Sequence, residues 1–150
     1  MAFPELLKGN WQDEVRALCG GAHATDVPDT LLALDSYGPS SESEIKKVLP
    51  DWDALNDDSD KAADLNRAAI RRVAAKICDY CKIKFRKQSE RIGGEYEYTM
   101  AKIDWPQRKL ELLAEYYDFL ADLDPEAVSS LSYIDKIERV PPVYEDLELE

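Results

Sequence analysis

The sequence predicts an all-α protein in which a helical bundle surrounds one long central helix. Residues 59–92 contain neither proline nor glycine, so no residue in this stretch interrupts a helix. On both sides, shorter segments with helical spacing of apolar residues are separated by residues that start or stop helices. We expect one helical domain over residues 1–131, with an antiparallel partner helix and a small loop or hairpin before it, and an extended acidic C-terminal arm over residues 132–150.

The first short helix is predicted directly after Asn10, because an asparagine side chain can cap the free N–H groups of a first helical turn. Trp11, Val15 and Leu18 follow at helical spacing. Gly20 is expected to end this helix.

Three further short segments precede the long helix. Residues 26–38 predict a second helix, which the Gly38-Pro39 dipeptide is expected to end. The spacing of Ser41 and Glu44 is typical of a capping box and predicts a third helix. Residues 51–60 are too polar for more than one helical turn.

The long helix is predicted to begin near Asp58 or Ser59 and to run to Gly93. About 32 residues at ~1.5 Å each make a rod of roughly 48 Å. Its last two turns are much more polar, so we expect that end to project beyond the core. The predicted apolar stripe consists of Ile70, Ala74, Ile77, Cys81 and Phe85, widened by Val73, Tyr80 and Ile83.

A weak strand or extended loop is predicted over residues 95–103, where tyrosine and methionine alternate with polar residues. A helix with Asp104 as its cap follows, and a short helical turn starts after Asp124 and extends to about Leu131. The expected apolar face of the helix after Asp104 consists of Leu110, Leu113, Ala114, Tyr117, Leu120 and Ala121.

Charge is distributed unevenly along the chain. The net charge is −12, yet the stretch from Lys61 to Ile92 holds ten cations and three anions, a net +7 that leaves −19 for the rest. A positively charged helix in an otherwise acidic chain predicts surfaces of complementary charge, either within the fold or between copies of the chain.

The Cys78-x-x-Cys81 pair is the most conspicuous candidate for metal or redox chemistry. A structural zinc ion takes four ligands, whereas the third cysteine, Cys19, and the one histidine, His23, lie far away in the sequence. We therefore interpret the pair as small core residues with reduced thiols, as in a cytosolic protein. With no phosphate-binding loop and no marked nucleophile, we expect no enzyme activity, no catalytic residue, no metal and no cofactor.

A run of cations follows this pair and has three interpretations. The first interpretation is a solvated helix end near the C-terminal dipole, and the second is a nucleic-acid contact. The third is a contact with an acidic surface of a neighbouring molecule. The acidic remainder of the chain disfavours the nucleic-acid contact because it repels phosphates. The predicted subunit or partner interface therefore consists of Lys82, Lys84, Arg86, Lys87 and Arg91.

The order of the elements over residues 10–125 follows a known pattern. Short N-terminal helices lead through the aspartate-rich link "LPDWDALNDDSD" to the long helix "SDKAADLNRAAIRRVAAKICDYCKIKFRKQSERIGG". The loop "EYEYTMAKI" and the helix "DWPQRKLELLAEYYDFLADL" come next. This order resembles the head–tail connector (adaptor, or head-completion) proteins of tailed bacteriophages.

The resemblance implies a structural virion protein at the head–tail junction, made in the host cytoplasm. Identical subunits would form a ring, dodecameric in expectation, that sits under the portal protein and offers a docking platform to the next tail or stopper protein. DNA would pass through the channel without specific binding, and no membrane would be involved. The arm would engage the portal through Tyr133, Ile134, Ile137, Val140, Pro141, Pro142, Val143 and Tyr144.

Two other classes of function remain open from the sequence. A small acidic regulator or DNA mimic would share the negative charge, but it gives no reason for the basic helix or the Pro-Pro arm. A thiol or metal enzyme would require bound zinc or a reactive Cys78.

Overall fold

The computed structural model describes residues 3–88 and 94–129, with the side chains of residues 86–88 and 129 left out. Within these ranges the chain forms helices and no strand, which confirms the predicted all-α class. The helices are α1 (Trp11–Leu18), α2 (Asp29–Leu32), α3 (Gly38–Val48), α4 (Trp52–Asn56), α5 (Ser59–Gln88), α6 (Glu95–Lys102), α7 (Trp105–Leu123) and α8 (Pro125–Ser129).

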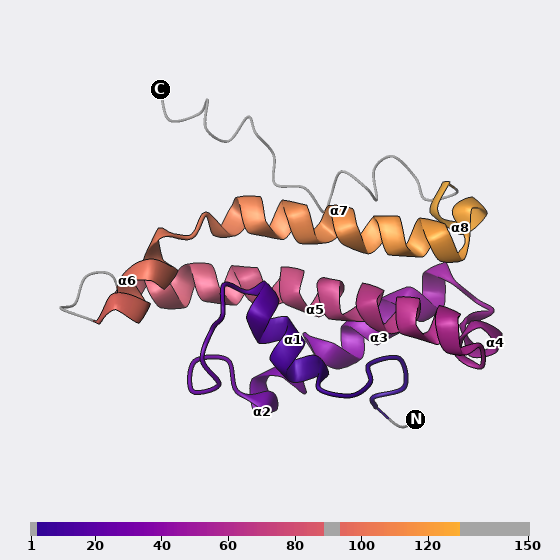
Figure 1. Cartoon of the computed structure of the whole chain (residues 1–150), viewed down its shortest axis with the longest axis horizontal. Helices are drawn as coiled ribbons and strands as arrows, with labels where there is room; N and C mark the ends of the chain where they lie inside the picture. Colours follow the sequence, from indigo (N-terminus) through magenta and orange to yellow (C-terminus); the bar gives the residue numbers. More distant parts are fainter. Residues whose placement is uncertain (1–2, 89–93, 130–150) are drawn as a thin grey trace.

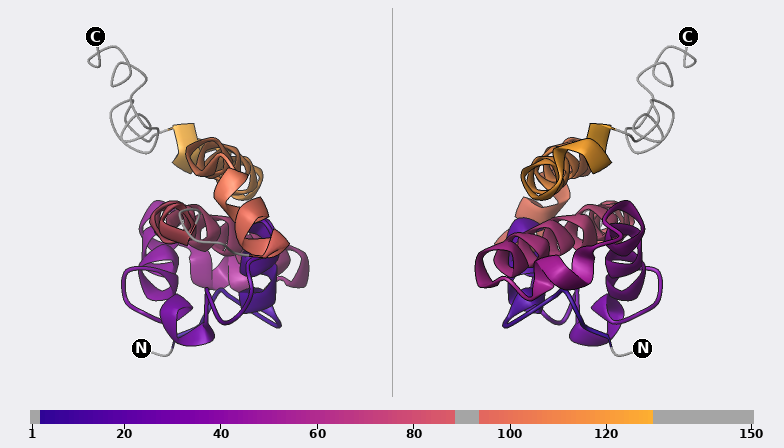
Figure 2. Two further views of the ribbon diagram at one scale, coloured as in Figure 1. Left: turned by 90° about the vertical axis from the view of Figure 1, so that its left-hand side faces the viewer. Right: turned by 90° about the vertical axis from the view of Figure 1, so that its right-hand side faces the viewer.

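Helix α5 lies in the middle of the molecule (Figure 1). Helix α7 runs antiparallel along one side of it, and α1 to α4 cover the other side, as the end-on views also show (Figure 2). The short helix α6 joins α5 to α7 at one end, and α4 and α8 lie at the opposite end. The central helix and its antiparallel partner are therefore as the sequence predicts.

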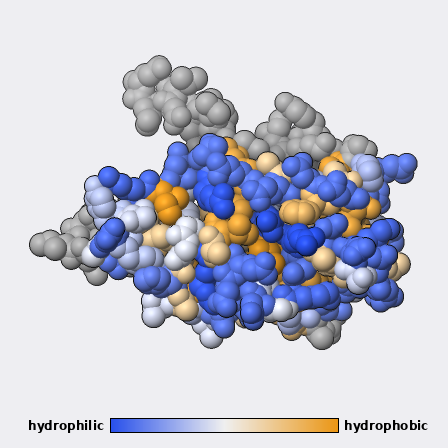
Figure 3. All heavy atoms as spheres, in the orientation of Figure 1, coloured by the Kyte–Doolittle hydropathy of each residue, from blue (hydrophilic) through white to orange (hydrophobic). Residues whose placement is uncertain are grey.

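The middle of α5 is buried almost all the way round because it packs between two layers. Four alanines, Ala68, Ala69, Ala74 and Ala75, are each 0% exposed. Alanine favours the helix and keeps the side of the rod narrow, so neighbouring helices approach closely. Larger side chains such as Ile70 fill the remaining space to close-packed density. The surface is mostly hydrophilic, with hydrophobic residues showing between α7 and the helices beneath it (Figure 3).

A buried carboxylate fastens the segment before α1 to the bundle. Glu42 of α3 is 3% exposed. Its side chain accepts hydrogen bonds from the backbone N–H groups of Glu5 at 3.0 Å, Leu6 at 2.7 Å and Leu7 at 2.8 Å. Because successive N–H groups converge on one anion, Leu6 and Leu7 can turn their side chains into the core without leaving these donors unpaired.

The prediction of a strand or loop over residues 95–103 is wrong, because α6 occupies Glu95–Lys102. Glu97 accepts a hydrogen bond from the N–H of Gly94 at 2.8 Å and so caps the helix. Tyr96 and Met100, four residues apart, face the core, while Tyr98 is 61% exposed. The alternation that resembles a strand hides this helical spacing.

The predicted start of α3 is also wrong. Gly38-Pro39 begins this helix instead of ending the previous one, and proline is well suited to a first turn. Ser41 therefore lies inside the helix, where its hydroxyl donates to the carbonyl of Tyr37 at 2.7 Å. Glu44 does not complete a capping box but forms ion pairs with α5.

Side-chain placement on the two long helices differs from the prediction in two places. Ile83 is 56% exposed and is not part of the apolar stripe of α5. Phe85, by contrast, is 0% exposed, which confirms its place in the predicted stripe. The core-facing residues of α7 are turned relative to the predicted face and are Trp105, Leu112, Leu113, Tyr116 and Leu120.

Helix ends agree well with local signals elsewhere. Asp104 caps α7 by accepting the N–H of Gln107 at 3.1 Å. Asn10 precedes α1 as expected, although its side chain makes no capping hydrogen bond.

The predicted arm, residues 132–150, lies outside the described residues. No helix in the described part of the chain is both long and apolar enough to span a membrane.

Candidate interaction surface at the end of the central helix

Several cations of α5 are neutralised inside the fold. Arg71 bonds the Glu115 carboxylate on α7 at 3.0 Å. On the opposite layer, Glu44 accepts from Arg72 at 2.6 Å and from Lys76 at 3.0 Å. These ion pairs join α5 to both of its neighbouring layers. Much of the positive charge that the sequence concentrates in this stretch therefore meets partners within the same chain.

The Glu44 carboxylate is held in its charged form by this arrangement. Burial by itself acts to raise the pKa of Glu44, but the charges and hydrogen bonds of Arg72 and Lys76 outweigh burial and lower the pKa below 4.5. Because the charged form is favoured in the folded state, Glu44 contributes to stability at neutral pH.

We expect Glu44→Gln to lower the free energy of unfolding by about 1–2 kcal/mol at pH 7. Since the pKa is lowered on folding, the contribution of Glu44 is complete above the unfolded value and is lost as pH falls through the folded pKa. Urea unfolding at a series of pH values should show the two proteins converging below about pH 4.5. Glu14→Gln, an exposed change on α1, is the control. A difference that stays constant with pH would contradict the assignment.

The loop between α1 and α2 is fastened to the end of α5 through Asp26. The Asp26 carbonyl accepts from the Tyr80 hydroxyl at 2.9 Å, and its carboxylate accepts from the Tyr96 hydroxyl at 2.7 Å. Lys84 lies 3.5 Å from the same carboxylate, with its side chain 29% exposed. Lys84, which the sequence assigns to a contact between molecules, therefore has an intramolecular partner.

Helix α6 is held against the same loop. The His23 ring stacks on the Tyr96 ring with centroids 3.6 Å apart. The backbone N–H of His23 donates to the Tyr96 hydroxyl at 2.8 Å. Burial and the hydrogen bond to Asp26 raise the pKa of Tyr96. The sequence signals neither Asp26 nor Tyr96, because their partners are more than 50 residues away.

Two exposed residues remain at this end of α5. Lys82 is exposed and forms no ion pair with the described part of the chain. Ile83, beside it, is 56% exposed. The remaining predicted interface residues, Arg86, Lys87 and Arg91, have side chains outside the described ones. The candidate surface, defined here as Lys82 and Ile83, combines a cation with an apolar side chain.

The three cysteines lie in the core. Cys78 and Cys81 are 1% and 0% exposed, which confirms their interpretation as core residues. Cys19, distant in sequence, is also 0% exposed and packs against α5, where its thiol lies 3.5 Å from the Ala74 carbonyl oxygen. Across the described residues, no group of three histidine, cysteine or acidic side chains has an arrangement that could hold a metal ion.

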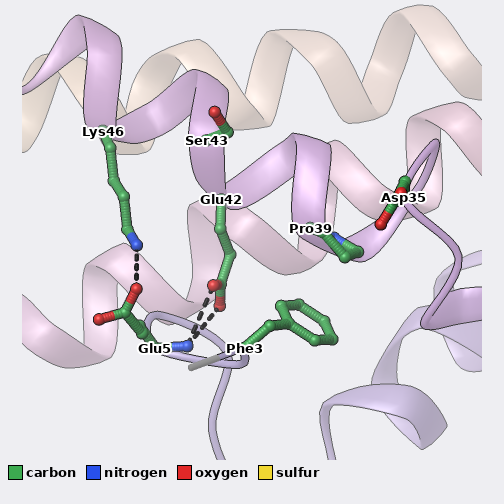
Figure 4. A pocket seen from close by; sticks show the side chains of 7 residues that line it. All are labelled: Phe3, Glu5, Asp35, Pro39, Glu42, Ser43 and Lys46. Atoms are coloured by element: carbon green, nitrogen blue, oxygen red, sulfur yellow. Dashed lines mark hydrogen bonds and ion pairs between the residues drawn. The ribbon is translucent and has the colours of Figure 1, made fainter. Parts of the chain in front are cut away.

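A small open pocket of about 270 Å³ lies between α3 and the N-terminal segment (Figure 4). Its charged groups already hold the fold together: Glu42 binds backbone N–H groups, and Glu5 pairs with Lys46. Asp35 at its edge is exposed. The contacts that line this pocket therefore fasten the N-terminal segment to α3.

The end of α5 and the pocket beside α3 are thus defined by contacts within this chain. Comparison with protein-family models, with curated proteins and with solved structures found no match.

Proposed function

We propose that this chain is a structural subunit of the head–tail junction of a tailed bacteriophage, where copies form a ring between the portal and the tail. The observation that carries the proposal is the arrangement of α5, α6 and α7. A 30-residue helix turns through a short helix into an antiparallel partner, and short N-terminal helices cover its other side. The family resemblance implies the same long helix and antiparallel partner, with a loop where this chain has α6.

The distribution of exposed charge supports contacts between copies. In a ring each subunit uses two different surfaces, one for each neighbour. Lys82 and Ile83 lie toward the α6 end of the molecule, whereas the opposite end carries exposed aspartates. Complementary charges orient such contacts, and an apolar side chain at the centre adds affinity. The exposed aspartates at the α4 end are Asp51, Asp53, Asp57, Asp58 and Asp60.

The net charge of −12 suits a channel through which DNA passes. A basic wall would bind phosphates and release counterions, which would hold the DNA in place. An acidic wall repels the DNA backbone and lets it slide. Passage without specific binding is therefore part of the proposal.

Ring formation is tested by reversing charge at the candidate surface. We expect Lys82→Glu to reduce assembly with the portal protein of the same phage at least tenfold while the monomer stays folded. The matched control is Lys47→Glu, an exposed lysine on α3 that belongs to neither of the two proposed surfaces. Lys84 is less suitable because its pairing with Asp26 would confound folding with assembly. Light scattering and electron microscopy measure assembly, and unchanged ring formation by Lys82→Glu would contradict the proposed contact.

The proposed role of the arm is tested by deleting residues 132–150. In the described part of the chain the buried core residues run from Leu6 to Leu120, so we expect the shortened chain to fold. It should not join the portal, because the apolar and Pro-Pro segment that would dock there is gone. Circular dichroism measures folding and cosedimentation measures portal binding. An unfolded product, or normal assembly, would contradict this role.

The alternative is a DNA mimic, which the cluster of exposed aspartates at the α4 end favours. Such a protein would stay a monomer or dimer under the conditions that assemble rings. It would bind a basic DNA-binding protein, and duplex DNA would compete with it. The same light-scattering measurement therefore separates the two functions.

A further inference from the structure

Three thiols from two helices meet at the junction of α1 and α5. Cys19 is the residue that ends α1, and Cys78 and Cys81 lie one turn apart in α5. All three are free and buried. No local sequence signal connects Cys19 to the other two, so their meeting is a product of the tertiary fold.

The contact of Cys19 with α5 places it beside Cys78. Its Sγ lies 3.5 Å from the carbonyl oxygen of Ala74. In an α-helix, the carbonyl of residue 74 points toward the turn that carries residue 78. The neighbouring thiols of Cys78 and Cys81, together with burial, raise the pKa of Cys19. Cys19 therefore packs against the turn of α5 that carries Cys78.

We propose that Cys19 and Cys78 form a modification site, at which hydrogen peroxide converts two buried thiols into a disulfide that joins α1 to α5. The Cys19 sulfur attacks one peroxide oxygen, the O–O bond breaks, and a sulfenic acid and one water form. The Cys78 sulfur then displaces the hydroxyl of the sulfenic acid, giving the S–S bond and a second water. Each peroxide is reduced to two waters as two thiols are oxidised.

The closed fold protects these thiols because all of them are buried, and the raised pKa of Cys19 further disfavours its reactive thiolate. Oxidation therefore proceeds through opening of the end of α1. This helix has eight residues and is followed by Gly20 and Gly21, whose φ values are 72° and 77°. Such short ends open locally at a smaller free-energy cost than the whole core. When α1 closes again, it returns an oxidised Cys19 to the side of Cys78.

The test treats the full-length protein with hydrogen peroxide and follows its mass. We expect the monomer to lose about 2 Da, and peptide mapping without reductant to find Cys19 joined to Cys78. The melting temperature should rise by roughly 5–10 °C and return after dithiothreitol, because the link closes a long loop. Urea below the unfolding transition should accelerate the reaction several-fold, since it favours opening.

Two variants sharpen this test. Cys19→Ser should abolish the mass loss, whereas the matched Cys81→Ser should retain it. The mapping on the unaltered protein needs neither variant, so a variant that fails to fold leaves the proposal testable. A link confined to Cys78 and Cys81, a link between molecules, or sulfinic acids without any link would each overturn the proposal.

Discussion

Replacing Glu42 with alanine should lower the free energy of unfolding by about 3–5 kcal/mol. The change removes the acceptor for the backbone N–H groups of Glu5, Leu6 and Leu7, and two of these hydrogen bonds are buried. An unsatisfied buried donor costs about 1–3 kcal/mol, and several share this one carboxylate. Urea unfolding measures the loss, and hydrogen exchange locates it at these amides.

The neighbouring residue provides a matched control for this prediction. Ser43 is exposed on the same helix, and Ser43→Ala should change stability by no more than about 0.5 kcal/mol. Glu42→Gln should fall between the two, since its amide oxygen still accepts but carries no charge. Protection of the amides at Leu6 and Leu7 that survives Glu42→Ala would show that another group holds the segment.

Replacing Phe85 with alanine should lower the free energy of unfolding by about 3–5 kcal/mol. Phe85 is 0% exposed and lies where α5, α6 and α7 meet. Its ring centroid is 6.0 Å from that of Tyr96 on α6 and 6.0 Å from that of Trp105 on α7. A cavity at this point would remove contacts from three helices at once. Urea unfolding followed by tryptophan fluorescence measures the effect.

Ile83 is the matched control for Phe85 because it lies two residues away on the same helix. It is 56% exposed, so Ile83→Ala should change stability by no more than about 0.5 kcal/mol. Equal losses from the two variants would mean that the core does not extend to this end of α5. The pair also separates stability from assembly, since Ile83 belongs to the candidate surface and Phe85 does not.

Helices whose signals are local were predictable from the sequence. The long uninterrupted stretch predicts α5, and its first residue, Ser59, agrees with the expected start. Asp104 predicts the beginning of α7 because its cap bonds a residue three positions away. Helix α6 was missed because its alternating tyrosines resemble a strand, whereas contacts of Tyr96 with the distant His23 and Asp26 stabilise the helix.

The candidate surface was only partly predictable. The run of cations directs attention to the end of α5, but sequence does not reveal which of them find partners in the same chain. Lys84 meets Asp26 across a separation of 58 residues, and Lys82 does not share that contact. Ile83 was expected to widen the apolar stripe of α5, and only the packed structure shows that it is 56% exposed.

The all-α class, the long central helix and the concentration of positive charge along it follow from residue order without any tertiary contact. Each depends on residue type or on spacing within a few turns. Only the packing of the helices brings Glu44 and Glu115 to the cations in the middle of that helix, Glu42 to the N-terminal segment, and Cys19 to the Ala74 carbonyl of α5. These contacts join residues distant in the chain, so they exist only once the helices have packed.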